Sequence, residues 1–150
     1  MIFTVSTGLT AGKRASLFAA LGCTAGIIPH LLASILGLSA LLHTSALAFE
    51  ALKFAGAAYL LYLAYATWRD RSAFAMSDTP AVATARSLML RGFLLNILNP
   101  KLTIFFLAFL PQFVTPGSTA PAVQMLVLSG VFMAMTFAVF VVYGLSLIHI

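Results

Sequence analysis

The stretch from Ala15 to Leu42, ASLFAALGCTAGIIPHLLASILGLSALL, contains no formal charge over about 28 residues. An α-helix of this length extends roughly 42 Å, which exceeds the hydrocarbon core of a bilayer at about 30 Å. The stretch is too long for the apolar region of a signal peptide, and no small-residue cleavage site with a polar segment follows it. It therefore predicts a tilted transmembrane helix.

The composition of the whole chain points the same way. Of its 150 residues 62% are hydrophobic and only 7% are charged, and the mean hydropathy is +1.08. Soluble domains are about one quarter charged, so the composition excludes a water-soluble globule and predicts a protein that crosses the lipid bilayer several times. The net charge of +5 comes from residues between the apolar runs and not from a basic face, which excludes nucleic-acid binding. Cys23 is the only cysteine, so no intrachain disulfide forms.

Three further apolar runs follow the first, and none has the alternation of a strand. We expect an all-α, polytopic membrane helix bundle forming one transmembrane domain over residues 1–150. Its spans are predicted at about residues 15–42, 46–68, 92–114 and 122–145, and the polar stretch 69–91, with Asp70, Asp78 and Pro80, is predicted to be a loop.

The basic residues predict the orientation of these spans. Most of them precede the first span or lie between the second and third: Lys13, Arg14, Arg69, Arg71, Arg86 and Arg91. Because cytoplasmic connections carry the excess of Lys and Arg, the Met1 end and the loop 69–91 are expected to be cytoplasmic.

Small residues form a stripe on the first span, where Gly22, Gly26, His30, Ala33 and Gly37 recur at helical spacing. The glycines predict close helix packing, as does Gly56 in the second span, within one chain or between copies in a homo-oligomer. The stripe turns His30 toward protein, and Pro29 predicts a kink beside it. His30 is either a substrate contact or proton relay, or a neutral histidine bonded to a neighbouring helix.

The third span contains the most informative polar cluster. Asn96, Asn99 and Thr103 are spaced to share one helix face, and Pro100 removes the hydrogen bond that the Asn96 carbonyl would accept. Lys101 is expected near the bilayer midplane, where an ammonium costs at least about 2.5 kcal/mol on insertion scales. Broken helices with such groups form the polar-solute sites of carriers. The alternative is that Lys101 snorkels and Pro100 only kinks a packed helix.

Glu50 and Lys53, near the start of the second span, are spaced to form an interfacial ion pair. Alternatively, Lys53 turns inward and binds the carboxylate of a substrate. We find no enzyme motif, no metal-ligand cluster and no cofactor-binding motif, so neither an enzyme nor a metal or cofactor site is expected.

Several motifs in order resemble one known family. They are Gly12-Lys13-Arg14-Ala15, Ala20-Leu21-Gly22, Gly26-x-x-x-His30, Leu52 to Leu60 (LKFAGAAYL), Arg91-Gly92-Phe93-x-x-Asn96-x-x-Asn99-Pro100-Lys101 and Phe106-x-x-x-Leu110-Pro111-Gln112-Phe113. Together they are similar to the LysE/RhtB family of amino-acid exporters, over residues 1 to about 144.

The resemblance implies a multi-pass carrier of about six spans in the bacterial inner membrane. Such a carrier exports amino acids or their derivatives (homoserine, threonine or lysine) in exchange for protons. The chain would then hold four of the six spans and lack the first and the last, in keeping with its apolar ends: it begins with Ile2, Phe3 and Val5, and it stops at Leu145 to Ile150 without a polar tail, His149 lying between isoleucines. The expected substrate site comprises His30, Lys53, Asn96, Asn99, Pro100 and Lys101, the lysines facing the carboxylate and the amides the ammonium. The alternative is a non-transporting membrane fragment that packs on other helices.

Overall fold

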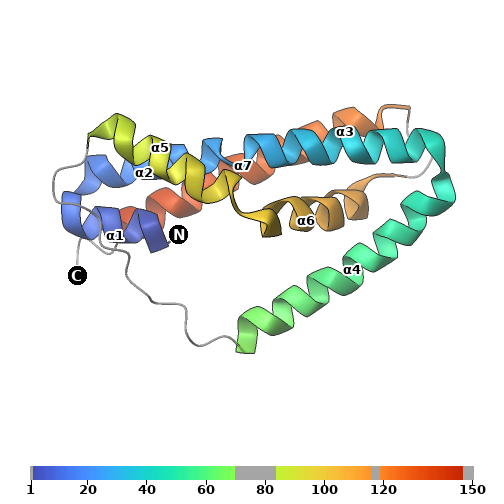
Figure 1. Cartoon of the computed structure of the whole chain (residues 1–150), viewed down its shortest axis with the longest axis horizontal. Coiled ribbons are helices and arrows are strands. Elements are labelled where there is room, and N and C mark those ends of the chain that lie inside the picture. Colours follow the sequence, from blue (N-terminus) through green and yellow to red (C-terminus); the bar gives the residue numbers. More distant parts are fainter. Residues whose placement is uncertain (1, 70–83, 116–118, 147–150) are drawn as a thin grey trace. The chain divides into compact units, whose positions relative to one another are not determined.

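The structure, a computed structural model, describes residues 2–69, 84–115 and 119–146 (Figure 1). All regular elements in these ranges are helices, which confirms the all-α class: α1 (Ile2–Ala11), α2 (Lys13–Ala25), α3 (Ile28–Thr44), α4 (Ala46–Arg69), α5 (Ala85–Ile97), α6 (Pro100–Phe109), the 3₁₀ helix η1 (Leu110–Phe113) and α7 (Pro121–Ser146). Met1, His149 and the predicted loop between residues 70 and 83, with both of its aspartates, lie outside the described residues.

Three helical segments are long and apolar enough to cross a membrane. They are Lys13–Thr44, which joins α2 and α3, then α4, and then Pro121–Leu145 of α7. The pair formed by α5 and by α6 with η1 passes the same test when taken together, either as an interrupted span or as a re-entrant loop. The chain is therefore a multi-pass membrane protein.

The first helix, α1, was not expected from the sequence. It buries its hydroxyl residues Thr4, Ser6 and Thr7, whereas Ile2 and Leu9 are exposed. The Thr7 hydroxyl donates to the Phe3 carbonyl at 2.7 Å. Serine and threonine have modest helix propensity in water, but here they lie inside the protein while the apolar side chains face outward. This inversion hid the helix from a search for long apolar runs.

The predicted loop also ends earlier than expected. Helix α5 begins at Ala85 and not at Gly92, because Thr84 caps it: its side chain accepts a hydrogen bond from the Ser87 N–H at 3.3 Å. Arg86 and Arg91 therefore lie on a helix, where both are exposed. Reading these arginines as loop residues was wrong, since a charged first turn is compatible with a helix that starts outside the hydrocarbon.

A kink was expected beside Pro29, and the α-helical hydrogen bonding is interrupted there, between α2 and α3. The Gly26 N–H still donates to Gly22, but the Ile27 N–H donates to the Thr24 carbonyl at 3.1 Å, a tighter turn than that of an α-helix. Pro29 has no N–H with which to continue the α-helical pattern to Ala25. The sequence therefore located this break correctly.

The contacts divide the chain into two compact units, which we describe separately. The first consists of α1, α2, α5 and the part of α7 from Phe132 onward. The second consists of α3 from Pro29 onward, α4, α6, η1 and the part of α7 up to Val131.

In the first unit α2 and α5 pack through glycine. A Cβ added to Gly22 would overlap the backbone of Met89, and one added to Gly26 would lie 2.6 Å from the Phe93 carbonyl oxygen. Gly92 of α5 meets the backbone of α2 equally closely. Only a residue without a side chain permits this approach of two helices.

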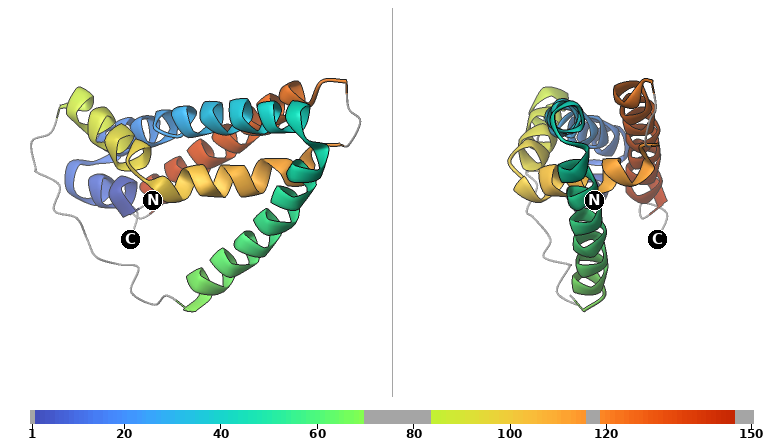
Figure 2. Two further views of the ribbon diagram at one scale, coloured as in Figure 1. Left: turned by 45° about the vertical axis from the view of Figure 1, so that its right-hand side comes forward. Right: turned by 90° about the vertical axis from the view of Figure 1, so that its right-hand side faces the viewer.

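In the second unit α4 crosses α6 where Gly56 meets Ala108. A Cβ on Gly56 would lie 2.8 Å from both the Cα and the carbonyl oxygen of Ala108. The two helices converge at their η1 end and diverge toward Arg69 (Figure 2). This close contact is the kind of helix packing that the sequence predicted for Gly56.

Gly37 differs from the prediction. It is exposed, and apart from the backbone of its own helix no atom of a described residue comes within 4 Å of a Cβ built on it. The stripe of small residues thus continues on α3 beyond the part that packs against a described helix.

We expect Gly22→Ala to destabilise the protein by about 1 to 3 kcal/mol, because the new methyl group forces α2 and α5 apart. Gly37→Ala is the matched control, and it should leave stability unchanged or raise it by up to about 1 kcal/mol, since alanine is the better helix former. Thermal unfolding of both variants in one detergent measures the difference. Equal effects at the two positions would contradict this packing.

Candidate functional site

The N-terminal turn of α6 exposes polar groups within an apolar span. Asn99 is its N-cap: the side-chain Oδ1 accepts a hydrogen bond from the Lys101 N–H at 3.1 Å. Pro100 occupies the first position of the helix, where its missing N–H costs nothing. The Nδ2 hydrogens of Asn99 form no hydrogen bond with a residue that the structure describes, so they can be donated to a ligand.

The Lys101 side chain projects from the same turn and is exposed. Its ammonium forms no ion pair with any residue that the structure describes. A helix N-terminus carries about half a positive charge, so this cation is at the end of the helix where an anion is most favoured. Lys101, the Asn99 amide and the N-terminus of α6 therefore all attract a negative group.

His30 lies in the second unit with this turn. Its Nδ1 is 2.6 Å from the Thr103 hydroxyl of α6, and the ring is 7% exposed. Thr103 follows Asn99 by four residues, so both lie on one face of α6. His30 is thus bonded to a neighbouring helix, and the bond joins α3 to the helix that exposes Asn99 and Lys101.

One turn further along α3, Ser34 is fully buried and its hydroxyl has no hydrogen-bond partner among the described residues. An unsatisfied buried hydroxyl costs about 1 to 3 kcal/mol. A serine in an apolar run carries no distinguishing pattern, so the sequence gives no signal that would identify this residue.

Asn96 belongs to the first unit and is engaged there. Its Nδ2 donates to the Cys23 carbonyl at 2.6 Å, and its Cβ lies against Gly26. The chain leaves the helical path at Leu98 and Asn99, so the face expected to carry Asn96, Asn99 and Thr103 is not continuous. The reason is Pro100, which cannot extend α5.

Lys53 lies at the opposite end of α6 from Lys101. Its carbonyl oxygen accepts a 2.6 Å hydrogen bond from Nε2 of Gln112 in η1. Eleven residues separate Lys101 from Gln112, which corresponds to roughly 16 Å of helix. The structure therefore does not bring the two lysines to the same turn.

The interfacial ion pair expected between Glu50 and Lys53 is not formed. The interpretation as a pair was wrong, because spacing on a helix permits such a contact without requiring it. Gln112 was quoted in the sequence analysis only as part of a motif. A glutamine directly after a proline in an apolar stretch was the one signal that could have identified it.

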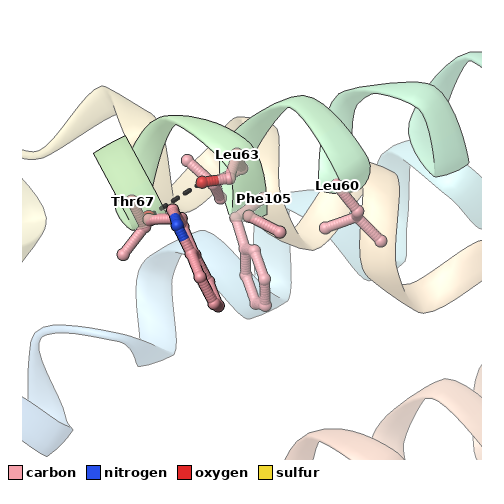
Figure 3. Close-up of a pocket in the computed structure, with 6 residues that line it drawn as sticks. Leu60, Leu63, Thr67 and Phe105 are labelled. Atoms are coloured by element: carbon pink, nitrogen blue, oxygen red, sulfur yellow. Dashed lines mark hydrogen bonds between the residues drawn. The ribbon is translucent and has the colours of Figure 1, made fainter. Parts of the chain in front are cut away.

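A groove of about 450 Å³ lies between α4 and α6 where the two helices diverge (Figure 3). It is lined by Leu60, Leu63, Ala64, Thr67, Trp68 and Phe105. The Thr67 hydroxyl donates to the Leu63 carbonyl at 2.8 Å, so the lining offers a polar solute neither a charge nor a free hydroxyl donor. Among the described residues no group of three metal-ligating side chains occurs.

Comparisons with known proteins identify the family. The LysE type translocator family matches residues 1–148. An uncharacterized membrane protein of Vibrio cholerae is 38% identical over 112 residues, which are 75% of this chain and 55% of that protein. The homoserine/homoserine lactone efflux protein of Salmonella typhimurium is 33% identical over 140 residues, 86% of this chain and 68% of its own. No solved structure matches.

An uncharacterized membrane protein of Bacillus subtilis is 29% identical over 143 residues, 88% of this chain and 68% of that protein. The chain thus spans between 55% and 68% of the length of these three relatives. The family is one of translocators and not of enzymes, in agreement with the sequence analysis. With the match covering nearly the whole chain, the protein belongs to the LysE type translocator family.

Proposed function

We propose that the protein exports amino acids or amino-acid derivatives across the bacterial inner membrane, and that the substrate carboxylate binds at the N-terminal end of α6. The observation that carries this proposal is the turn formed by Asn99, Pro100 and Lys101. The family, and relatives named as homoserine/homoserine lactone efflux proteins, support transport of such solutes.

The chemistry of this turn favours a carboxylate over an ammonium. The Lys101 ammonium, the Asn99 Nδ2 hydrogens and the N-terminal dipole of α6 are all donors or positive charges. From the sequence, both asparagine amides were expected to contact the substrate ammonium. We now propose that Asn99 contacts the substrate carboxylate instead. Its Oδ1 already accepts a hydrogen bond from the Lys101 N–H, whereas its Nδ2 hydrogens can donate to a carboxylate.

We further propose that export is coupled to proton exchange and that His30 takes part. Its ring is buried, it is bonded to Thr103, and Thr103 lies one turn from the proposed carboxylate site. The imidazole ring can donate or accept a hydrogen bond, so its bond to Thr103 connects α3 to the turn where we propose that the substrate carboxylate binds.

The orientation of the spans stays as proposed from the sequence, with the Lys13 end on the cytoplasmic side. The segment Lys13–Thr44 then crosses the membrane outward, which puts Thr44 and the start of α4 on the outer side. The described cations Arg69 and Arg86, at the far end of α4 and the start of α5, return to the cytoplasmic side.

Lys101→Ala and Asn99→Asp should each raise KM for exported amino acids by about tenfold, the factor expected for one charge-assisted hydrogen bond. Asn99→Asp keeps the cap of α6, because the new carboxylate still accepts a hydrogen bond from the Lys101 N–H. It repels a substrate carboxylate, so this variant tests binding and not folding. Efflux of radiolabelled homoserine, threonine, lysine and leucine from expressing cells is the measurement. Arg14→Ala, an exposed cation of the first unit, serves as the control, and unchanged flux in the two site variants would refute the assignment.

Thr103→Val should slow proton-coupled efflux several-fold, because the isosteric methyl group leaves His30 Nδ1 without its 2.6 Å partner. Thr103→Ser keeps a hydroxyl and should retain most of the activity. Substrate efflux and internal pH recorded together in proteoliposomes compare the two variants. Identical coupling in valine and serine variants would show that the contact has no part in proton exchange.

The orientation is tested with single cysteines introduced into a Cys23→Ala background. A membrane-impermeant maleimide added to intact cells should label Thr44→Cys and Thr119→Cys, which the proposed topology puts outside. Lys13→Cys and Thr84→Cys should react only after the membrane is opened. The reverse pattern would invert the topology.

A further inference from the structure

We propose that Lys53 forms a second carboxylate-binding site, on the outer side of the membrane and separate from the site at Lys101, and that Gln112 is the residue that positions it. The inference rests on the proposed function, because it assumes that the solute carries a carboxylate. It departs from the expectation that both lysines grip one carboxylate, and the observations come from the second unit alone.

Gln112 joins η1 to the segment of α4 that contains Lys53. Its Nε2 donates to the Lys53 carbonyl at 2.6 Å and to the Ala108 carbonyl at 3.1 Å, so both amide hydrogens are used. In the 3₁₀ turn that begins at Leu110, the Ala108 carbonyl would accept from residue 111, which is Pro111 and has no N–H. The Gln112 amide thus replaces a missing backbone donor and ties the end of α6 to α4.

The close contact of Gly56 with Ala108 lies next to this bond. Gly56 follows Lys53 by three residues, and Ala108 precedes Gln112 by four, so the two contacts lie on neighbouring turns of an antiparallel pair. Two contacts of this kind set both the separation of the helices and their register. The backbone of Lys53 is therefore fixed relative to α6.

The ammonium of Lys53, by contrast, has no partner among the residues that the structure describes. Lys53 is half-buried in an apolar helix, forms no ion pair with Glu50 and makes no other described contact through Nζ. An ammonium in a membrane span requires an anion or water. A fixed backbone with such a charge is the arrangement that a carboxylate site requires.

The two ends of α6 lie at different depths in the proposed topology. Lys101 begins the second half of an interrupted span, whereas Gln112 ends that span and Lys53 lies in the second turn of α4, whose start is on the outer side. The backbones at these two ends of α6 are roughly 16 Å apart, so the two lysines belong to different turns. Lys101 is then the inner site and Lys53 the outer one, used in turn during export.

Side-specific kinetics test this order. Exchange of radiolabelled homoserine and threonine is measured in right-side-out and inside-out vesicles containing the whole chain. Lys53→Gln should raise KM about tenfold when substrate is supplied from the outer face and leave KM at the cytoplasmic face unchanged. Lys101→Gln should raise KM by a similar factor at the cytoplasmic face and leave KM at the outer face unchanged.

Gln112→Leu should reproduce the outer-face effect of Lys53→Gln and add nothing to it in the double variant, because it acts through Lys53. Gln124→Leu is the matched control, since the Gln124 side chain bonds a backbone N–H of the same unit, that of Thr115, at 3.2 Å without touching Lys53. If Gln112→Leu fails to fold, Gln112→Met, which keeps the length of the side chain, takes its place in the same double variant.

The outcomes separate this inference from the proposed function. If Lys101→Gln leaves KM unchanged at both faces, the inner carboxylate site is refuted. If Lys101→Gln acts at the cytoplasmic face while Lys53→Gln acts at neither, only the outer site is refuted, and Lys53 then serves the lipid interface. If Gln112→Leu raises the outer-face KM by the same factor in the Lys53→Gln variant as in the unmodified protein, Gln112 does not act through Lys53 and its positioning role is refuted.

Discussion

In a membrane span every backbone N–H and C=O must find a partner in the protein, because the hydrocarbon offers none. The architecture described here depends on how the chain meets this constraint at three prolines. Pro29, Pro100 and Pro111 each remove a donor inside an otherwise apolar helix. At each of them the helix breaks or tightens, and a different group repairs the hydrogen bonding.

The repairs differ in what they leave available to a solute. At Pro29 a tighter backbone turn is enough, and it separates α2 from α3. At Pro100 the Asn99 side chain caps a new helix, which leaves a lysine and an amide donor exposed at a positive helix end. At Pro111 the Gln112 amide replaces the donor and fastens α4 to α6. Two of the three repairs thus create the polar surroundings on which our proposals rest.

Close packing through glycine is the second constraint, and sequence alone recovered only part of it. The spacing of Gly22, Gly26 and Gly37 predicted a packed stripe. In lipid the hydrophobic effect does not drive helices together, so they associate through close van der Waals contact, which small residues permit. The structure shows α5 as the partner of the first two glycines, while Gly37 meets no described atom. A periodic pattern identifies a face of a helix, but it does not identify what lies against that face.

The sequence by itself determined the all-α membrane class, the long spans, the breaks beside Pro29 and Pro100 and the family resemblance, since each follows from hydropathy, proline chemistry or an ordered motif. Tertiary structure decided the rest. It separated Lys53 from Lys101, bonded Asn96 to Cys23, gave His30 the partner Thr103 and revealed the inverted helix α1. These depend on contacts between residues distant in the chain, about 73 positions apart for the two asparagine and histidine bonds, and no local spacing encodes such contacts.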